Sequence, residues 1–325
     1  MIFVRLCIYQ VDYGDELQMN FKKFAKIVSL VLVMCIVLLM GVYTARMFVY
    51  KTNDGKYAGT TKISGSRVNI LVMATDKGGM LTDTIMFASL NKKTNKLNIM
   101  SVPRDTRVKL GNSFGKINSA YGMGKEGKRQ ELSIEKVTEL IGMPVNYYVV
   151  INPKAFRNII DILGGVEIDV PQRMYYVDPT QDLVIDLYPG KQVLNGAKAE
   201  QFCRFRSGYA SADLGRIDAQ QMFIKELFKQ KLNPKYLGKI DEIYDEIIEN
   251  IDTNIEIGDV FTFLPVVKAM TGDSMNTFRL PGESATISNI SYYICDREET
   301  DKLVNEVFLA DGKLSDKLPE PTDKE

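Results

Sequence analysis

An uncharged apolar run of nineteen residues, from Ile27 to Ala45, is the strongest constraint on how this chain of 325 residues folds. At 1.5 Å per residue, a helix of that length spans about 28 Å, close to the hydrocarbon thickness of a bilayer. Basic residues flank the run: Lys22, Lys23 and Lys26 precede it and Arg46 follows it. Because a basic cluster stays in the cytoplasm, the pattern predicts a single-pass cell-membrane protein with a cytoplasmic tail over 1–26, a transmembrane helix over 27–46 and an extracellular remainder.

A cleaved signal peptide is the alternative for the same run. The apolar stretch is longer than a signal-peptide core, and no small-x-small cleavage site follows it closely. A buried core helix is less favoured, because both faces of the run are apolar. Met19 stands directly before the basic cluster, and we hypothesise that it is the true start; N-terminal sequencing that finds Met1 would contradict this.

The 279 residues that follow the span (325 − 46) suffice for one large domain with a sizeable core. Residues 47–66 include a stretch rich in Lys, Thr, Gly and Ser and are predicted to form a linker. Residues 316–325 are charged, contain two prolines and are predicted to be a flexible tail. We therefore expect a single domain over 67–315.

Strand patterns alternate with helix patterns along this domain. Apolar runs predict strands over Val68–Ala74, Thr84–Leu90, Leu97–Val102, Tyr147–Ile151 and Val166–Val170. Helices are expected over Ser133–Ile141, with Ser133 as the cap, over Pro153–Leu163, near Ala197–Gln201, and in a long segment that carries Ile217, Phe223, Ile224, Leu227 and Phe228 on one face. Another helical stripe, interpreted as core packing, contains Leu237, Ile240, Tyr244, Ile247 and Ile251. This interleaving predicts an α/β fold, a central mixed β-sheet flanked by helices.

The composition excludes several kinds of active site. The chain has no histidine, so it cannot build a Ser-His-Asp triad, a Cys-His pair or a His-ligated zinc site. Lys plus Arg (41) equals Asp plus Glu (41), which argues against nucleic acid as a partner. Any enzyme made from this chain must use carboxylates, Arg, Lys, hydroxyls or a hard metal ion.

The four cysteines do not form a disulfide framework. On the predicted topology Cys7 is cytoplasmic and Cys35 lies in the membrane, which leaves Cys203 and Cys295 outside. A disulfide between these two is possible in an oxidising exterior, but two buried thiols are the favoured interpretation.

Two carboxylates lie at the ends of neighbouring predicted strands. Asp76 follows the first strand, Asp83 precedes the second, and a glycine turn separates them. Such a pair could share a divalent ion, most plausibly Mg²⁺, which favours oxygen ligands and keeps several waters. The alternative is that both are turn-forming residues with solvated carboxylates.

Three arginines and a glutamine form a candidate anion site. Arg104 stands apart from them: it follows the third strand and precedes Asp105, and a local ion pair between these neighbours is the usual explanation. Arg204 and Arg206 alternate along a segment expected to be extended and so share a face, and Arg216 and Gln220 are four apart on the next helix. Guanidinium groups that converge near a helix start suit a pyrophosphate, and a solvated basic face is the competing interpretation.

At these residues the sequence resembles the LytR-CpsA-Psr family of Gram-positive cell-envelope proteins. The matching motifs, in one order and spacing, are Asp76 to Asp83-Thr-Ile, Val-Pro-Arg-Asp-Thr at 102–106, Lys116-Ile-Asn-Ser-Ala-Tyr121, Asp161-Ile-Leu-Gly-Gly-Val-Glu-Ile-Asp-Val170, and Leu194-Asn-Gly196 through Arg204-Phe-Arg206 to Gly215-Arg-Ile-Asp-Ala-Gln-Gln221. They cover about Val68 to Leu232, and the predicted membrane anchor matches the family as well.

The resemblance implies a membrane-anchored phosphotransferase that moves an anionic glycopolymer, teichoic acid or capsular polysaccharide, from a polyprenyl-pyrophosphate carrier to peptidoglycan. It implies that Arg104, Arg204, Arg206, Arg216 and Gln220 grip the pyrophosphate and that Asp76 and Asp83 hold Mg²⁺. Asp83, Arg104 and Arg206 are the expected catalytic residues, with Asp83 orienting or deprotonating the attacking hydroxyl.

The sequence departs from the family pattern at three positions. Leu81 stands where an Arg is common, Ala74 where a Gly is usual, and Ser119 where a His is common. Lys77 is the candidate to replace the missing charge. Leu81 favours a rival hypothesis, a non-catalytic polyprenyl-phosphate-binding scaffold or regulator of envelope assembly, whereas the intact arginines favour the enzyme. Transcription attenuation conflicts with the predicted topology.

Overall fold

The computed structural model describes residues 66–179, 183–206, 212–231, 246 and 250–309, all within the compact unit Tyr57–Glu325. The predicted cytoplasmic tail, membrane span and C-terminal tail, and almost all of the linker, lie outside these residues. Within the described ranges, no helix is long and apolar enough to span a membrane.

Six strands form the central sheet in the order β11-β6-β1-β2-β3-β12. Their bounds are β1 Arg67–Thr75, β2 Thr82–Asn91, β3 Lys96–Ser101, β6 Tyr147–Ile151, β11 Ile251–Thr253 and β12 Met275–Arg279. Strand β1 runs parallel to β6 and antiparallel to β2, while β3 runs antiparallel to β2 and parallel to β12. The predicted central mixed sheet is therefore confirmed, as are its strands β1, β2, β3 and β6.

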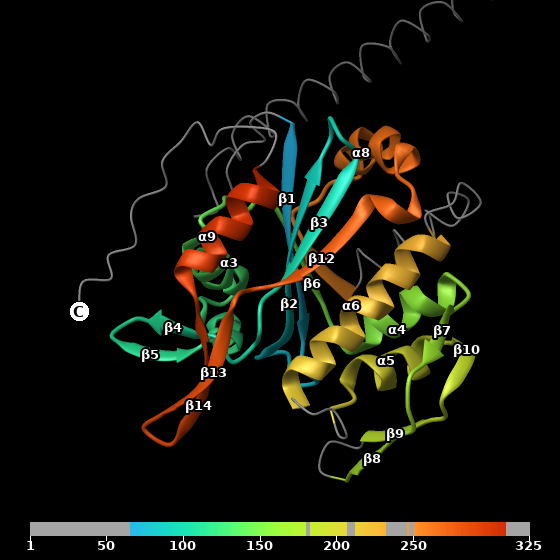
Figure 1. Cartoon of the computed structure of the whole chain (residues 1–325), viewed down its shortest axis with the longest axis horizontal. Coiled ribbons are helices and arrows are strands. Elements are labelled where there is room, and N and C mark those ends of the chain that lie inside the picture. The colour runs from blue at the N-terminus through green and yellow to red at the C-terminus, as the bar shows by residue number, and fades with distance from the viewer. Residues whose placement is uncertain (1–65, 180–182, 207–211, 232–245, 247–249, 310–325) are drawn as a thin grey trace, which may run out of the picture. The chain divides into compact units, whose positions relative to one another are not determined.

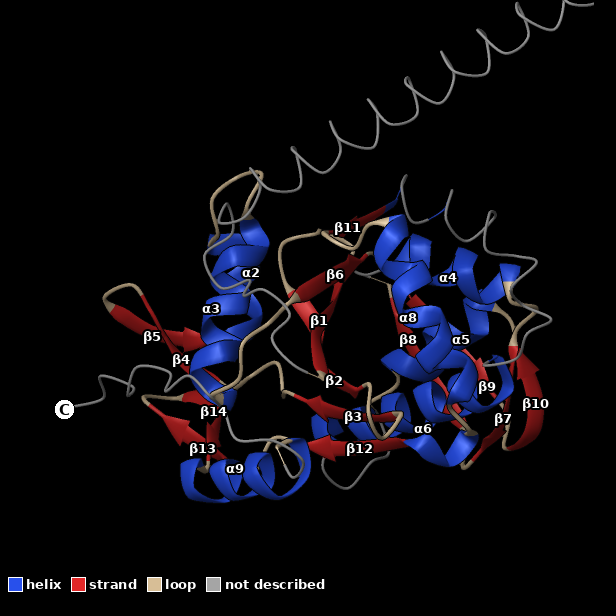
Figure 2. Ribbon diagram, turned by 90° about the horizontal axis from the view of Figure 1, so that it is seen from above, coloured by secondary structure: helices blue, strands red, loops and turns tan. Residues whose placement is uncertain are grey.

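Helices cover both faces of this sheet (Figures 1 and 2). One side carries α3 (Arg129–Ile141) and α9 (Arg297–Leu303), and the other carries α4 (Pro153–Ile162), α5 (Gly196–Arg204) and α6 (Ala212–Lys231). The other helices in the described ranges are η1 Ile117–Ser119, α2 Ala120–Met123, α8 Ile257–Ala269, η3 Gly272–Ser274 and η4 Val304–Phe308.

The alternation of side chains along β1 produces these two layers. Leu71 and Met73, both fully buried, pack into the core formed with α3 and η4. Ile70 and Val72 point to the opposite face and pack in the clusters that contain Phe228 of α6. Successive strand residues point to opposite faces of a sheet, so β1 is apolar from Ile70 to Ala74 because both of its faces are covered there.

Helix α6 differs from the prediction that its apolar residues share one face. Phe223 and Leu227 pack against α5 and the strands beyond it, whereas Ile224 and Phe228 pack against the central sheet. The helix is therefore sandwiched between two cores, which holds it firmly at the edge of the candidate site.

Among the residues that the structure describes, paired strands outside the central sheet form four ribbons. They are β4 Arg107–Leu110 with β5 Ser113–Lys116, β7 Val166–Val170 with β10 Gly190–Leu194, β8 Met174–Asp178 with β9 Leu183–Leu187, and β13 Gly282–Ile287 with β14 Ile290–Cys295. The sequence predicted β7 and no strand in the stretch from there to Gly190. That expectation is wrong, because β8 and β9 occupy it and bury Met174, Ile185 and Leu187.

Two further local expectations need correction. Ser133 does not cap α3, which begins four residues earlier at Arg129; Ser133 is 1% exposed within the helix. Ile251 begins strand β11 rather than ending a helix. Leu237, Ile240, Tyr244 and Ile247 of the same stripe lie outside the described residues.

Candidate active site

The loop between β1 and β2 places the two predicted carboxylates. Asp76 directly follows β1, as predicted. Asp83 was expected just before the second strand, but β2 begins at Thr82, so Asp83 is its second residue. Asp76 Oδ1 accepts hydrogen bonds from the backbone N–H groups of Met80 at 3.0 Å and Leu81 at 3.1 Å. One oxygen of Asp76 therefore closes its own loop. This turn role was the alternative to metal binding, and it leaves the second oxygen for another partner.

Helix α2 supports this loop from one side. A Cβ atom added at Gly122 would lie 2.5 Å from the main-chain oxygen of Met80, so only glycine allows the two backbones to approach this closely. The side chains of Met80 and Leu81 are nevertheless 42% and 39% exposed. The loop backbone is thus fixed while its apolar side chains face solvent.

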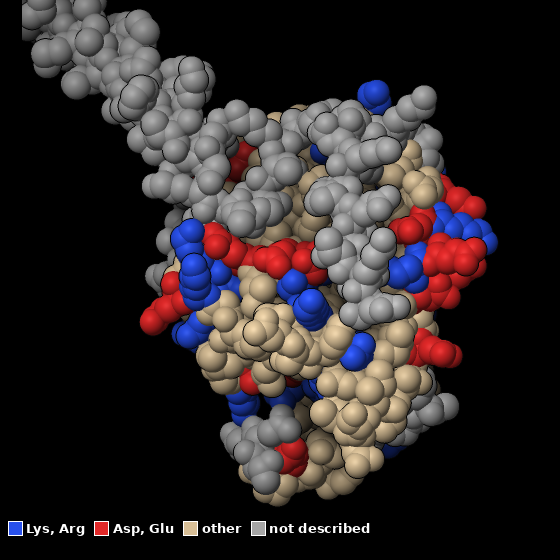
Figure 3. Space-filling model, turned by 90° about the vertical axis from the view of Figure 1, so that its left-hand side faces the viewer, with Lys and Arg blue, Asp and Glu red and all other residues tan. Residues whose placement is uncertain are grey.

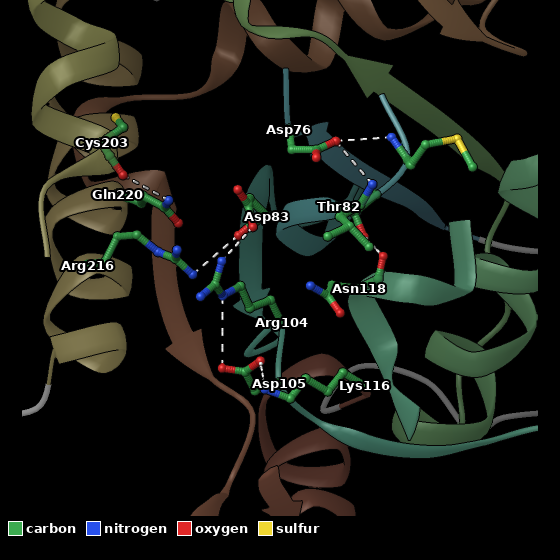
Figure 4. Close-up of polar contacts among 12 residues, drawn as sticks. Asp76, Thr82, Asp83, Arg104, Asp105, Lys116, Asn118, Cys203, Arg216 and Gln220 are labelled. Carbon is green, nitrogen blue, oxygen red and sulfur yellow. Dashed lines mark hydrogen bonds and ion pairs between the residues drawn. The ribbon is translucent and has the colours of Figure 1, made fainter. Parts of the chain in front are cut away.

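Asp83 lies among cationic groups from distant parts of the chain (Figure 4). Its Oδ1 is 2.7 Å from Nη1 of Arg104, and these side chains are 33% and 20% exposed. From α6, Nη2 of Arg216 donates to the main-chain oxygen of Asp83 at 3.4 Å. Arg216 is 2% exposed, so a nearly buried positive charge lies beside the strand that carries Asp83.

A second tier of charge lies behind Arg104. Asp105 places Oδ2 3.9 Å from Nε of Arg104 and Oδ1 2.8 Å from Nζ of Lys116. The ion pair of Arg104 with Asp105, the competing explanation from sequence, is therefore present together with the one to Asp83. Lys116 is a site cation that the sequence did not single out; its place in the motif over 116–121 was the available signal.

Arg204 does not lie in an extended segment. It is the last residue of α5, and its Nη1 contacts Oε1 of Glu200, one turn earlier, at 3.0 Å. Glu200 also accepts a hydrogen bond from Arg157 of α4. Arg206 follows two residues after the helix and is part-buried. The expectation that Arg204 and Arg206 share one face of an extended chain is therefore wrong.

Gln220 links the end of α5 to α6. Its Nε2 donates to the main-chain oxygen of Cys203 at 3.1 Å, and its side chain is 8% exposed. Arg216 lies one helical turn earlier and reaches Asp83, so the predicted pairing of these residues on one side of α6 is confirmed. Figure 4 shows both projecting from α6 toward the residues of the site.

The two cysteines in the described ranges are free, so the prediction of unpaired thiols is confirmed, but both residues are half-buried rather than buried. Burial, and after it the negative charge of Glu200, raise the pKa of Cys203 to about 12. Burial also raises the pKa of Cys295. Both are protonated near neutral pH, so neither is ready as a thiolate nucleophile.

The residues present fit a magnesium ion better than a soft metal. The described part of the chain brings no three His, Cys, Asp or Glu residues together around one point. Asp76 and Asp83 each have one oxygen engaged by protein groups and a second carboxylate oxygen beside it. Two hard oxygen donors, completed by water and by substrate phosphate, are a donor set that Mg²⁺ accepts.

Comparison with known proteins connects this arrangement to a family. The family model described as "LytR_cpsA_psr family" matches residues 40–308. A polyisoprenyl-teichoic acid–peptidoglycan teichoic acid transferase, TagU of Oceanobacillus iheyensis, is 31% identical over 246 residues, which are 74% of this chain and 75% of the relative. The corresponding transferase TagV of Bacillus subtilis is 29% identical over 221 residues, 65% of this chain and 55% of the relative.

A solved structure shares the fold. The crystal structure of B. subtilis TagV superimposes with a TM-score of 0.62 and 26% sequence identity, covering 75% of this chain and 98% of that one. The match includes the central mixed sheet with helices on both faces.

Proposed function

Because the chain belongs to the LytR-CpsA-Psr family, we propose that it is a glycopolymer–peptidoglycan phosphotransferase that takes an anionic glycopolymer from a polyprenyl-pyrophosphate carrier. The polymer is a teichoic acid or a capsular polysaccharide, as the sequence resemblance implies. The observation that carries the proposal is the contact of Asp83 with Arg104, beside the buried guanidinium of Arg216. It places a carboxylate that can accept a proton next to fixed positive charge.

Phosphoryl transfer asks the protein mainly for positioning and for charge aimed at the phosphoryl oxygens. Arg104 and Arg216 provide that charge from rigid elements, and Lys116 offsets the negative charge of Asp105 beside Arg104. Buried guanidinium groups are suited to pyrophosphate because they stay charged and donate in a planar fork. The reacting phosphate would therefore lie against Asp83, between the end of β3 and the start of α6.

Asp83 is proposed to orient and deprotonate the attacking sugar hydroxyl. The hydroxyl oxygen bonds to the phosphorus attached to the polymer, and its proton passes to Asp83. The bond from that phosphorus to the bridging oxygen breaks, so the carrier leaves as polyprenyl phosphate. Arg104 already contacts this carboxylate at 2.7 Å and would stabilise the charge as it moves to the phosphoryl oxygens.

The end of α5 supplies the other part of the proposed pyrophosphate site. Arg204, fixed by Glu200, and Arg206 come from this end, and Gln220 ties it to α6. Arg206 is proposed as a catalytic contact to the leaving phosphate. Asp76 would hold Mg²⁺ through its second oxygen as the tighter ligand. Asp83 would bind the ion only loosely, because a tight metal ligand cannot also serve as the base. The ion would supply additional positive charge to the pyrophosphate.

Membrane attachment is part of the proposal. The apolar run over 27–46 would anchor the chain with its N-terminus in the cytoplasm and its domain outside. A lipid-linked donor is confined to the bilayer, so an anchored domain meets it at high effective concentration.

Single-turnover transfer tests the function with a synthetic lipid-linked donor, a peptidoglycan oligomer and Mg²⁺. We expect Arg206→Ala and Asp83→Ala each to lower the transfer rate by about 100-fold or more. The matched controls are Lys93→Ala and Asp169→Ala, which remove exposed charges from the β2–β3 turn and from β7. Unchanged binding and transfer in Arg206→Ala would contradict the pyrophosphate assignment.

A non-catalytic scaffold that binds polyprenyl phosphates is the second candidate. It is favoured by one observation: Leu81, at the position where the sequence pattern of the family has an arginine, is 39% exposed and brings no charge to the loop. The same experiment separates the two functions, because donor binding without any product would establish the scaffold.

A further inference from the structure

The β4–β5 ribbon has one apolar face and one cationic face. Val108 and Leu110 are 7% and 4% exposed and belong to the core beneath the ribbon. The antiparallel register places Arg107 opposite Lys116 and Lys109 opposite Phe114. Residues directly opposite one another share a face, so these four side chains form a cationic face that points away from the core.

Arg107 is held flat on this face by aromatic rings. Its guanidinium carbon lies 3.6 Å from the ring centroid of Phe114 and 5.9 Å from that of Tyr292 on β14. Stacking fixes the plane of a guanidinium and leaves its N–H edge free to donate in a fork to an anion. Phe114 is 49% exposed, so the stack is open to solvent.

The positive charge of this face is not neutralised locally. In the ranges that the structure describes, no carboxylate oxygen lies within 4.0 Å of the side-chain nitrogens of Arg107 or Lys109, and Nε of Arg107 is buried without a hydrogen-bond partner. Lys116 of the same ribbon and Arg104 of the candidate site, by contrast, contact carboxylates. Arg107 and Lys109 are therefore the part of this surface available to a negatively charged ligand.

The ribbon is continuous with the candidate active site. Lys116, the last residue of β5, contacts Asp105 of the site, and the N–H of Ile117 donates to Thr106 at 2.8 Å. The N–H of Asn118 donates to the main-chain oxygen of Arg104 at 3.1 Å. Figure 4 shows Lys116 and Asp105 directly beside Arg104. A polyanion that leaves the pyrophosphate site in this direction passes onto the cationic face.

We propose that the cationic face of the β4–β5 ribbon binds the backbone phosphates of the glycopolymer, as a phosphodiester-linked polyanion. This inference rests on the proposed function and adds a polymer subsite to it. Arg107 and Lys109 pair with successive phosphates, and the exposed ring of Phe114 contacts the carbon backbone between them. Charge complementarity selects this occupant, because two uncompensated cations beside an exposed ring suit an anionic chain of alternating polar and apolar units.

The surroundings of the ribbon agree with a local site rather than a generally basic surface. The β4–β5 and β13–β14 ribbons project on the side of the molecule seen in Figure 3. A band of acidic side chains crosses that side, and basic groups are scattered over the largely neutral surface below it. The acidic band disfavours a polyanion along that part of the surface.

Binding of a soluble oligo(glycerol phosphate) that carries neither lipid nor pyrophosphate tests the inference on the full chain in detergent. Fluorescence anisotropy compares the double variant Arg107→Gln/Lys109→Gln with the matched control Lys92→Gln/Lys93→Gln. The control removes the same charge from the β2–β3 turn, at the end of β2 opposite Asp83. We expect the dissociation constant to rise about tenfold in the first variant and less than about twofold in the control.

Equal weakening in both double variants, or no binding of the oligomer to the wild-type chain, would overturn the proposed subsite. Binding of a peptidoglycan fragment with an uncharged glycan is measured as well. If the Arg107→Gln/Lys109→Gln variant lost affinity for this fragment but not for the oligomer, the face would bind the acceptor, and the proposed polymer subsite would be overturned. Binding of inorganic pyrophosphate is measured in parallel and is expected to be equal in all three proteins. A wild-type chain that binds the oligomer through this face but does not bind pyrophosphate would support the subsite and contradict the proposed function.

Discussion

The two halves of the candidate site are held by different kinds of structure. The arginine half consists of Asp83, Arg104 and Arg216, which come from β2, from the end of β3 and from α6. Arg216 is 2% exposed, and the other two side chains are at most one-third exposed. The loop half is the segment from Asp76 to Leu81, where a carboxylate bonds to backbone only four and five residues away.

The positions of the charged groups in the arginine half therefore depend on the packing of the whole fold. The position of the carboxylate of Asp76 depends only on its own loop. The arginine half can be displaced only if packed elements move, so its geometry is fixed before any ligand binds. The loop half can exchange a partner at its second carboxylate oxygen without disturbing the sheet. We therefore expect substitutions in the first half to remove catalysis and those in the second half to adjust it.

Arg216→Met is expected to have the largest effect. It replaces a buried guanidinium by an apolar side chain of similar length, so we expect the single-turnover rate of transfer to fall about 1,000-fold. Arg279→Met is the control, because Arg279 on β12 pairs with Asp218 on the same helix but does not touch Asp83. Rates that fall equally in the two variants would show that any disturbance of α6 suffices.

Asp83→Asn tests whether the carboxylate acts as a base. The amide keeps the size and an acceptor for Arg104 but cannot take the proton, so a loss of about 100-fold in the transfer rate is expected. Asp105→Asn removes a carboxylate 3.9 Å from the other side of the same guanidinium, and a loss of about fivefold is expected for orientation alone. Identical losses would assign Asp83 to positioning Arg104 and contradict the base role.

Asp76 allows the loop role and the proposed metal role to be separated. Asp76→Asn keeps an oxygen for the amides of Met80 and Leu81, so the melting temperature should be unchanged while the Mg²⁺ concentration for half-maximal transfer rises about tenfold. Asp76→Leu also removes the acceptor and should lower the free energy of unfolding by about 1–2 kcal/mol. A Mg²⁺ response that is unchanged in Asp76→Asn would leave Asp76 with the loop role only.

Much of the fold was predictable because apolar periodicity reports burial. The strands β1, β2, β3, β6 and β7 and the helices α4 and α6 appeared where apolar runs and stop signals placed them. The order of strands in the sheet depends on contacts between distant segments, and no local pattern encodes it. The ribbons β8–β9 and β4–β5 were missed because several of their residues face solvent. The alternation of apolar and polar residues along their strands is therefore short and weak.

The site shows the same limit. The spacing of Arg216 and Gln220 predicted that they share one side of α6. The predicted strand ends located Asp76 and Asp83 near one another in the fold. Arg204 was misjudged because α5 continues three residues further than expected, with Phe202 buried and Glu200 paired to Arg204. Lys116 needed the tertiary contact with Asp105, across a β-ribbon, which a linear reading does not contain.

The smallest expected effect tests whether the contact between α5 and α6, beside the arginine half, excludes water in solution. The pKa of the Cys203 thiol is the property that measures this. The main-chain oxygen of this residue accepts the hydrogen bond from Gln220, and burial is the main cause that raises the thiol pKa to about 12 from an ordinary value of 9.0. Between pH 9 and 12 the folded state therefore holds a proton that the unfolded state has lost. The stability from this group is complete below pH 9, and the free energy of unfolding falls as pH rises, by about 1.4 kcal/mol per unit.

Denaturant unfolding of the wild-type chain and of Cys203→Ala at several pH values between 8 and 10.5 measures this contribution. Other groups titrate alike in both proteins, so the difference between the two curves is expected to be constant below pH 9 and to shrink above it. Cys295→Ala is the control; burial raises the pKa of Cys295 as well, but the hydrogen bond with Thr300 and the charge of Arg297 oppose the shift, so its slope should be smaller. If the slope were absent for Cys203, its pKa would lie near 9.0, the contact between α5 and α6 would be open to water, and the arginine half would be no more rigid than the loop half.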